Sequence, residues 1–327
     1  MTYLSSAAAL ITLVSALVGA LAPWPAEGQV AYPTQTIKLI VPNPAGGLPD
    51  TVSRIVGRRL QERLEQSVVV ENRPGANGRV AVAALLNAAA DGYTLLVTDG
   101  AIISINPLLF SNLTYDPKDL LPITMLARAP LFLAIHPKVP AATMSEFIAY
   151  ARGRPGQINY GSSGVGSTHH LSMEAMNASL MLTMTHVPFK GTGESVPALL
   201  GGHIEVLFSA YPSLSGAADG NQVRLLATNG AQRSAQAPNL PSLAEFIPGF
   251  DFAPVIGIFG RSDTPPAVVQ RIAAEAIAAV SDPALIKQLA VVGVEPAGAG
   301  PEDFAGALKA ETRRITEAVQ AAGIKGK

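Results

Sequence analysis

Twice in this chain a short apolar run leads through a loop of small residues into an amphipathic helix. The first succession runs from 37–41 through the proline- and glycine-rich loop 42–50 to a helical pattern that begins at Val52. The second runs from 158–160 through the serine- and glycine-rich loop 161–170 to apolar residues spaced as in a helix, beginning at Leu171. This order of strand, loop and helix predicts an α/β fold, in which ligands bind beyond the carboxyl ends of the strands.

Both loops have the composition of an anion site. Each would direct backbone N–H groups and the positive end of a helix dipole at one point, so that a small anion held between them needs no lysine or arginine. The alternative is that the glycines and serines only shape a turn and cap a helix. Loop 161–170 lacks the glycine order of a dinucleotide fingerprint, the Gly-Lys of a phosphate loop and the G-x-S-x-G of a hydrolase.

The intervening segments continue the alternation. Strand-like runs at 68–72 and 94–98 flank an alanine-rich helical stretch at 80–90, which predicts a largely parallel sheet. Further along, we expect a loop at 190–195 before a helix at 196–200, and helices capped by Thr143, Thr264 and Ser281.

Length and composition restrict the class of protein. A chain of 327 residues with 48% hydrophobic and 14% charged positions can bury a large core and is expected to form two domains. Its net charge of -1 argues against a nucleic-acid partner, because phosphate binding needs clustered lysine and arginine. The absence of cysteine excludes disulfides, thiolate metal sites and a cysteine nucleophile.

The amino-terminal segment is predicted to be an export signal covering residues 1–31. Residues 7–22 form an uncharged apolar run of 16 residues, which is short for a membrane span and suits the hydrophobic region of a signal peptide. No lysine or arginine precedes it, so a membrane anchor remains the alternative. No other run approaches spanning length.

Five blocks in order resemble one known family. They are Val41-Pro42 with Gly46-Gly47 and Asp50, then 70–78, 91–95, 160–167 and 186–191. Together they resemble the signature blocks of the tripartite tricarboxylate transporter receptors, also called the Bordetella uptake gene family, over about 33–325. The resemblance implies an α/β, two-lobed type II periplasmic binding protein (Venus flytrap). It also implies a monomer without cofactor or catalysis that captures a small di-, tri- or aromatic carboxylate for membrane transporter subunits.

The resemblance also implies lobe boundaries and ligand contacts. One lobe would comprise 33–128 and 254–327, the other 129–253, with the cleft between them and two crossings of the chain. Carried over by position, the ligand-binding residues would be Asn43, Ala45, Gly46, Gly47, Ala76, Asn77, Thr98, Ser163, Ser167, Thr168, Thr192 and Ser209. Many relatives have an aspartate where this chain has Ser209, and we therefore expect acidic amino acids to be poor ligands.

Other interpretations stay open at this stage. His169 and His170, with Glu174 one turn on, could suggest a metal site, but adjacent helical residues diverge and no third ligand is evident, so no metal is expected. Lys190 could face an anion or merely flank a turn. Asp50 and Asp99 could be a hydrolytic pair, although caps and turns favour aspartate. A ligand-presenting sensor for a signalling membrane protein and an exported hydrolase are the alternative functions.

Overall fold

Strand β1, at 37–41, initiates the first of two sheets because its apolar side chains are buried on both faces. The computed structural model describes residues 32–321 and 323–324; the expected signal peptide lies outside them. Residues from 35 onward form one compact unit, which holds all the elements described here. The strands are β1 Ile37–Val41, β2 Val68–Asn72, β3 Thr94–Asp99, β4 Leu120–Arg128, β5 Leu131–Ile135, β6 Asn159–Ser162, β7 Thr185–Pro188, β8 Val206–Ala210, β9 Arg224–Thr228, β10 Val255–Arg261 and β11 Glu295–Ala299.

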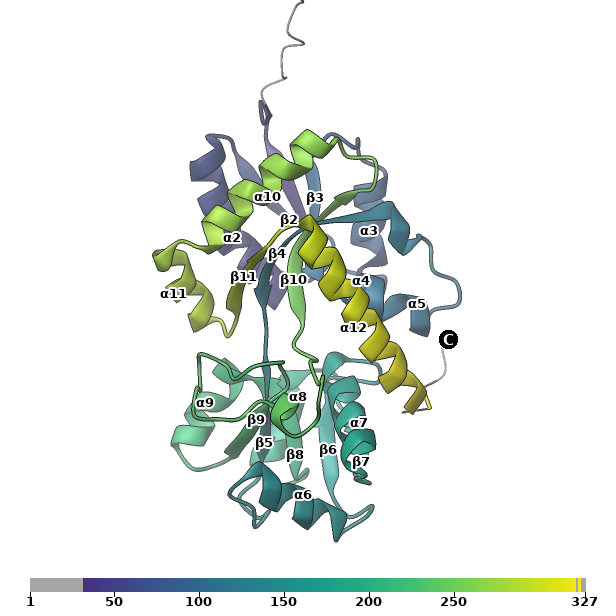
Figure 1. Cartoon of the computed structure of the whole chain (residues 1–327), viewed down its shortest axis with the longest axis vertical. Coiled ribbons are helices and arrows are strands. Elements are labelled where there is room, and N and C mark those ends of the chain that lie inside the picture. Colours follow the sequence, from purple (N-terminus) through teal and green to yellow (C-terminus); the bar gives the residue numbers. More distant parts are fainter. Residues whose placement is uncertain (1–31, 322, 325–327) are drawn as a thin grey trace, which may run out of the picture. The chain divides into compact units, whose positions relative to one another are not determined.

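The helices follow the strands in the alternating order that the sequence predicts (Figure 1). They are α2 Leu48–Leu64, α3 Arg79–Leu86, α4 Ala101–Ser104, α5 Asn106–Leu109, α6 Met144–Arg152, α7 Thr168–Leu180, α8 Thr192–Leu200, α9 Tyr211–Asp219, α10 Pro266–Val280, α11 Pro283–Val291 and α12 Pro301–Ala321. Short 3-10 turns lie at Ala76–Gly78, Pro117–Asp119 and Leu243–Glu245.

The first sheet has the strand order β11-β4-β10-β3-β1-β2. Strands β2, β1 and β3 are parallel, whereas β10 pairs antiparallel with both β3 and β4, and β11 antiparallel with β4. The sheet is therefore mixed, and the prediction of a largely parallel sheet holds only for its β2-β1-β3 part. The physical reason is the path of the chain, since β10 enters this sheet on the way back from the second one.

The second sheet has the order β7-β6-β8-β5-β9 and the same mixed character. Strands β7, β6 and β8 are parallel, and β5 pairs antiparallel with β8 and β9. The chain leaves the first sheet between β4 and β5 and returns between β9 and β10, which gives the two crossings expected of a two-lobed α/β protein.

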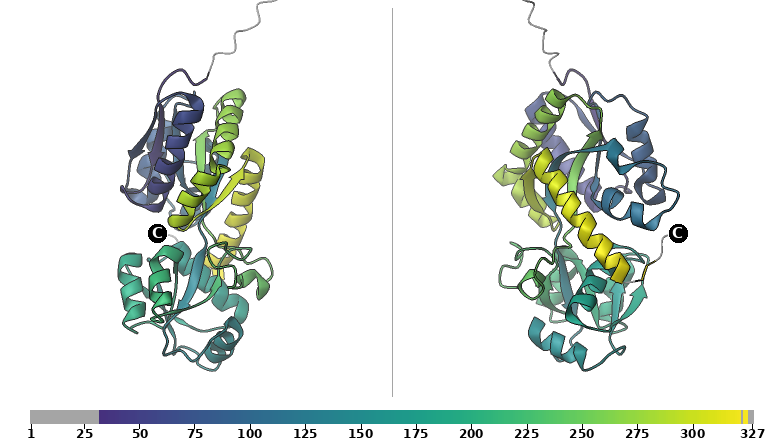
Figure 2. Two further views of the ribbon diagram at one scale, coloured as in Figure 1. Left: turned by 90° about the vertical axis from the view of Figure 1, so that its left-hand side faces the viewer. Right: turned by 45° about the vertical axis from the view of Figure 1, so that its right-hand side comes forward.

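Helix α12 connects the two sheets a third time. Its first half packs on the first sheet, where Phe304 is fully buried and lies so close to β10 that a β-carbon at Gly257 would be 2.3 Å from its ring. Its second half contributes Ile315, Ala318 and Val319 to the core of the second sheet, against α7. Figure 2 shows this helix from two sides, in yellow. None of the described helices is long and apolar enough to cross a bilayer.

Candidate functional site

The loops that leave the carboxyl ends of β1, β2, β3 and β6 surround one pocket of about 780 Å³. This volume lies in the usual range for small-molecule sites. Elements of both sheets form it. The residues that line this pocket, here called the pocket wall, are Pro42, Asn43, Pro44, Leu48, Pro49, Pro74, Gly75, Ala76, Asn77, Gly78, Thr98, Asp99, Ala101, Ile102, Ile105, Asn106, Leu109, Ala129, Leu131, Ser163, Val165, Gly166, Ser167, Thr168, His169, Thr192, Ala210, Ser213, Pro254 and Ile256.

Most of the residues carried over from the family pattern lie together in this wall. The first sheet supplies Asn43, Ala76, Asn77 and Thr98, and the second supplies Ser163, Ser167, Thr168 and Thr192. Ala45, Gly46 and Gly47 belong to the same β1–α2 loop but are outside the wall. Lys190 is exposed and is also outside it.

Ser209 is not in the wall. It is fully buried within β8 opposite Phe132, and its Oγ has no hydrogen-bond partner among the described residues. The strand continues to Ala210, and adjacent strand residues point to opposite faces. Ala210 therefore reaches the pocket instead, and Ser213 in the first turn of α9 also lines it.

Several helices begin at the pocket. The wall includes Leu48 of α2, Thr168 of α7, Thr192 of α8 and Ser213 in the first turn of α9. No side chain caps the amino ends of α2, α8 or α9. Helix α8 starts at Thr192, earlier than the predicted position 196, and this places Thr192 at the pocket. Uncapped N–H groups and aligned dipoles make this region favourable for an anion.

Asp50, in the first turn of α2, holds the β1–α2 loop in place from outside the pocket wall. It is 2% exposed and accepts hydrogen bonds from Gly46 N–H (2.9 Å), Asn72 Nδ2 (2.8 Å) and Arg54 Nε (3.1 Å). Burial alone would raise the pKa of Asp50, but these hydrogen bonds and the Arg54 charge hold that pKa below its ordinary value. The role is thus to fix the loop rather than to cap the helix, whose N-cap is Gly47.

Three histidines support the serine-glycine loop, residues 161–167. Ser163 Oγ and His169 Nδ1 are hydrogen-bonded at 2.8 Å, Ser162 Oγ and His186 Nε2 at 2.6 Å, and Gly166 N–H donates to His170 Nδ1 at 3.1 Å. The rings of His170 and His186 stack at 3.9 Å.

Desolvation lowers the pKa of His169, His170 and His186 to about 4, so all three are neutral at pH 7. Within the described residues, no group of three His, Cys, Asp or Glu side chains could hold a metal ion.

Asp99, the last residue of β3, is the acidic residue of the wall. Its Oδ1 accepts from Ala101 N–H at 3.1 Å, and desolvation raises its pKa. Asp50 is outside the wall and engaged by Arg54, so the two aspartates do not act on the pocket together.

Glu311 of α12 lies behind this end of the pocket. Its Oε1 is 2.9 Å from Ser104 Oγ, which also donates toward Gly100 O at 3.0 Å. Burial raises the pKa of Glu311 to about 7. Ser104 Oγ donates to Glu311 Oε1 and thereby favours the charged form, but burial outweighs this hydrogen bond and keeps the pKa raised.

Sequence reasoning missed the wall residues between β3 and β4. Ile102, Ile105 and Leu109 give the pocket an apolar side, and Asn106 Nδ2 donates to Asn77 O at 2.8 Å, which fixes the loop before α3. Helices α4 and α5 have four residues each, too short to show a helical period. Asn106-Pro107 was the one local signal of a helix start here.

The two sheets, the crossings and a pocket formed by both define a two-lobed α/β solute-binding protein. The chain belongs to the tripartite tricarboxylate transporter receptor family, whose model matches residues 52–324. The resemblance expected from the sequence is thereby confirmed, and so is the two-lobed fold. The family and the fold are those of solute-binding receptors.

Similar proteins agree with this assignment. Protein BugT of Bordetella pertussis is 31% identical over 320 residues, which cover 97% of each chain. Rpa4515 of R. palustris, solved with adipate, has a TM-score of 0.76 and 30% identity over 90% of this chain and 100% of its own. MatC of Rhodopseudomonas palustris, solved with bound malate, has a TM-score of 0.70 and 27% identity over 88% of this chain and 100% of its own.

Proposed function

We propose that this chain is an extracytoplasmic receptor that captures a small carboxylate in the pocket and presents it to the membrane subunits of a tripartite transporter. One observation carries the proposal. Uncapped helix starts from both sheets meet at a pocket whose described wall has no lysine or arginine. Such a site binds an anion through N–H groups and hydroxyls. The adipate and malate complexes of relatives support a carboxylate.

The contacts follow from the wall. In the proposal, Ser163 and Thr168 donate hydroxyl hydrogen bonds on the side of the second sheet, and the amino end of α8 at Thr192 adds N–H groups. Asn43, Asn77 and Thr98 supply the facing contacts, while Ala45, Gly46 and Gly47 shape the loop that holds Asn43. Charge-assisted hydrogen bonds contribute roughly 1.5–3 kcal/mol each, so four or five suffice for micromolar affinity.

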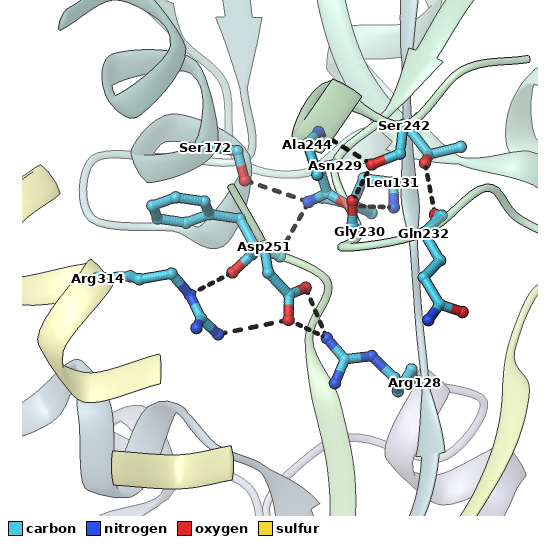
Figure 3. Close-up of polar contacts among 12 residues, drawn as sticks. Arg128, Leu131, Ser172, Asn229, Gly230, Gln232, Ser242, Ala244, Asp251 and Arg314 are labelled. Atoms are coloured by element: carbon cyan, nitrogen blue, oxygen red, sulfur yellow. Dashed lines mark hydrogen bonds and ion pairs between the residues drawn. The ribbon is translucent and has the colours of Figure 1, made fainter. Parts of the chain in front are cut away.

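The proposed lobes are 33–128 with 254–327, and 129–253, closing on the ligand about the two crossings. Asn229 holds both crossings together (Figure 3): its Oδ1 accepts from Leu131 N–H at 2.7 Å, and its Nδ2 donates to Phe252 O at 2.8 Å. Its backbone pairs with the same two residues. The bending must therefore occur beside Asn229, at 129–130 and 253–254.

Location and partners complete the proposal. The protein is exported by the signal at 1–31, works outside the cytoplasmic membrane as a monomer and performs no catalysis. What supports this is the family's receptor role. The proposed membrane subunits supply transport, so the chain itself needs only binding and closure.

A thermal-shift screen followed by calorimetry tests the proposal. The purified protein, dialysed to remove bound ligand, is screened against C4 to C6 dicarboxylates, citrate, benzoate, phthalate, nicotinate and acidic amino acids. Ligand at a hundred times its dissociation constant adds about 2.7 kcal/mol, a shift of several degrees. Ser163→Ala with Thr168→Val should weaken binding about tenfold or more, whereas Ser215→Ala, on α9 outside the wall, should not. No shift with any carboxylate, or turnover of a nitrophenyl ester, would contradict it.

A further inference from the structure

One hydrogen bond joins the side chains of Ser163 and His169 in the pocket wall. Ser163 Oγ and His169 Nδ1 are 2.8 Å apart, and both residues line the pocket. Ser163 belongs to the serine-glycine loop, whereas His169 is the second residue of α7. A single hydrogen lies between the two atoms, so one of them donates and the other accepts. The direction of this hydrogen bond decides what Ser163 can offer a ligand.

The Ser163 hydroxyl has only one hydrogen to donate. If it donates that hydrogen to His169 Nδ1, its oxygen can only accept further hydrogen bonds, and a carboxylate has none to give. If His169 Nδ1 carries a hydrogen and donates it to Ser163 Oγ, the hydroxyl hydrogen is available to a carboxylate. Donation by Ser163 to the ligand, which the proposed function requires, therefore needs the Nδ1–H form of His169.

His169 can provide this form at neutral pH. Desolvation lowers its pKa to about 4, so at pH 7 the ring carries one hydrogen, either on Nδ1 or on Nε2. Ser163 Oγ matches either form, since a hydroxyl both donates and accepts. The change from one form to the other moves a hydrogen between the two ring nitrogens and leaves the charge of the wall unchanged.

The adjacent His170 has no such choice. Its Nδ1 is 3.1 Å from the backbone nitrogen of Gly166, and a backbone N–H can only donate. The pKa of His170 is also lowered to about 4, so its neutral ring accepts at Nδ1 and carries its hydrogen on Nε2. His170 thus fixes the backbone of the serine-glycine loop, whereas His169 contacts a hydroxyl that can reverse its role.

We propose that His169 is a positioning residue, whose Nδ1–H donates to Ser163 Oγ in the ligand-bound protein and directs the Ser163 hydroxyl hydrogen to the carboxylate. His169 and His170 then have opposite tautomers, although they are adjacent in the sequence. Carboxylate binding favours the Nδ1–H form of His169 and leaves His170 in the Nε2–H form. This inference rests on the proposed function and names the residue that prepares one of its contacts.

Nitrogen-15 NMR of the histidine rings tests the tautomer directly. The protein is labelled in its histidines, and the ring signals that His169→Asn removes belong to His169. The ligand is the tightest-binding carboxylate of the thermal-shift screen, among the C4 to C6 dicarboxylates, citrate, benzoate and phthalate. Near neutral pH and at saturation, His169 Nδ1 should show the chemical shift of a protonated nitrogen and Nε2 that of an unprotonated one. The reverse pattern in the complex would overturn the proposal.

Calorimetry with the same ligand tests whether His169 acts through Ser163. His169→Leu should weaken binding about threefold to tenfold, because the neutral donor is lost. In a Ser163→Ala background the same substitution should have little further effect. His169→Asn should restore most of the affinity, because its side-chain amide carries an N–H donor. His203→Leu, which replaces an exposed histidine outside the wall, should leave binding unchanged, and melting temperatures show that each variant folds.

The outcomes separate this inference from the proposed function. If carboxylates bind but His169→Leu weakens binding equally with and without the Ser163 hydroxyl, or does not weaken it at all, His169 does not position Ser163 and the receptor function stands. Equal losses in His169→Asn and His169→Leu would contradict the need for a donor at this position. No binding by any carboxylate would overturn the proposed function, and this inference with it.

Discussion

Leu109 of α5 and Gly166 of the serine-glycine loop meet across the pocket, from the two sides of the cleft. A β-carbon at Gly166 would lie 2.6 Å from Leu109 Cδ1, closer than any side chain tolerates, and Gly166 has φ +79°. The backbone conformation favours glycine at this position, and a β-carbon would also displace the end of the Leu109 side chain.

Gly166→Ala should therefore lower both ligand affinity and stability. The left-handed conformation costs about 1–2 kcal/mol in a residue with a β-carbon, and relief of the contact must displace Leu109 or the loop. We expect about tenfold weaker carboxylate binding by calorimetry. The double variant Gly166→Ala with Leu109→Ala is compared with Leu109→Ala alone. In this comparison Gly166→Ala should cost only the free energy of the left-handed conformation, because the clash with the Leu109 side chain is gone.

Gly306→Ala is the matched control for this position. Gly306 lies within α12, and a β-carbon there has no heavy atom within 4 Å. Alanine should stabilise that helix by roughly 0.5–1 kcal/mol and leave binding unchanged. Equal effects of the two substitutions on affinity would contradict the importance of the Leu109 contact.

Asp251 ties three segments together beside the second crossing (Figure 3). Arg128 Nη2, at the end of β4, donates to both carboxylate oxygens at 2.6 Å, and Arg314 Nε of α12 donates to Asp251 O at 2.7 Å. The Asp251 side chain is 14% exposed. Asp251→Asn should lower the free energy of unfolding by about 1–3 kcal/mol, because Arg128 loses its charged partner.

Urea unfolding measures this effect against Glu62→Gln. The pair of Glu62 with Arg59 is on the surface, with Glu62 61% exposed, so its loss should cost at most about 1 kcal/mol. If Asp251→Asn were as mild as Glu62→Gln, the three-segment contact would not be a significant source of stability.

The raised pKa of Glu311 predicts how the stability of the protein depends on pH. Its folded-state pKa of about 7 exceeds its ordinary value, so the folded protein binds a proton that the unfolded chain releases between about pH 4.5 and 7. Its contribution to stability is present below about pH 4.5 and is lost as pH rises through 7. Glu311→Gln, which stays neutral, should gain stability relative to the wild type over that interval, by roughly 1–3 kcal/mol in total.

Comparison with the wild type at each pH isolates this carboxyl. The three histidines have pKa values lowered to about 4, so the unfolded chain binds protons at these histidines that the folded protein does not. Their contribution to stability therefore rises with pH, opposite to that of Glu311. It is the same in both proteins and cancels in the difference. Glu302→Gln, which removes an exposed carboxyl at the start of α12, is the control. A flat difference for Glu311→Gln between pH 5 and 8 would show that Glu311 titrates normally.

Local patterns predicted the elements but not every boundary. Thr143 caps α6 as expected, accepting from Glu146 N–H at 3.2 Å. The predicted caps Thr264 and Ser281 were each one residue early, since α10 follows Pro265 and α11 follows Asp282. Ser281 instead donates to Ile277 O at 2.8 Å at the end of α10, and Asp282 accepts from Ala284 N–H at 2.8 Å. Either of two neighbouring polar residues can cap a helix, and the sequence pattern does not show which of them does so.

The sequence by itself determined the strand-loop-helix units, the two crossings and the family, because these depend on apolar periodicity and on small residues at fixed places in the chain. Only the tertiary structure decided which loop residues reach the pocket. Ser209 is buried within β8 while Ala210 lines the pocket, and Asp99 lines the pocket beside Gly100, which Glu311 of α12 approaches closely. Such contacts join residues some 200 positions apart, as in the Ser104–Glu311 hydrogen bond, and they arise from packing that no local pattern encodes.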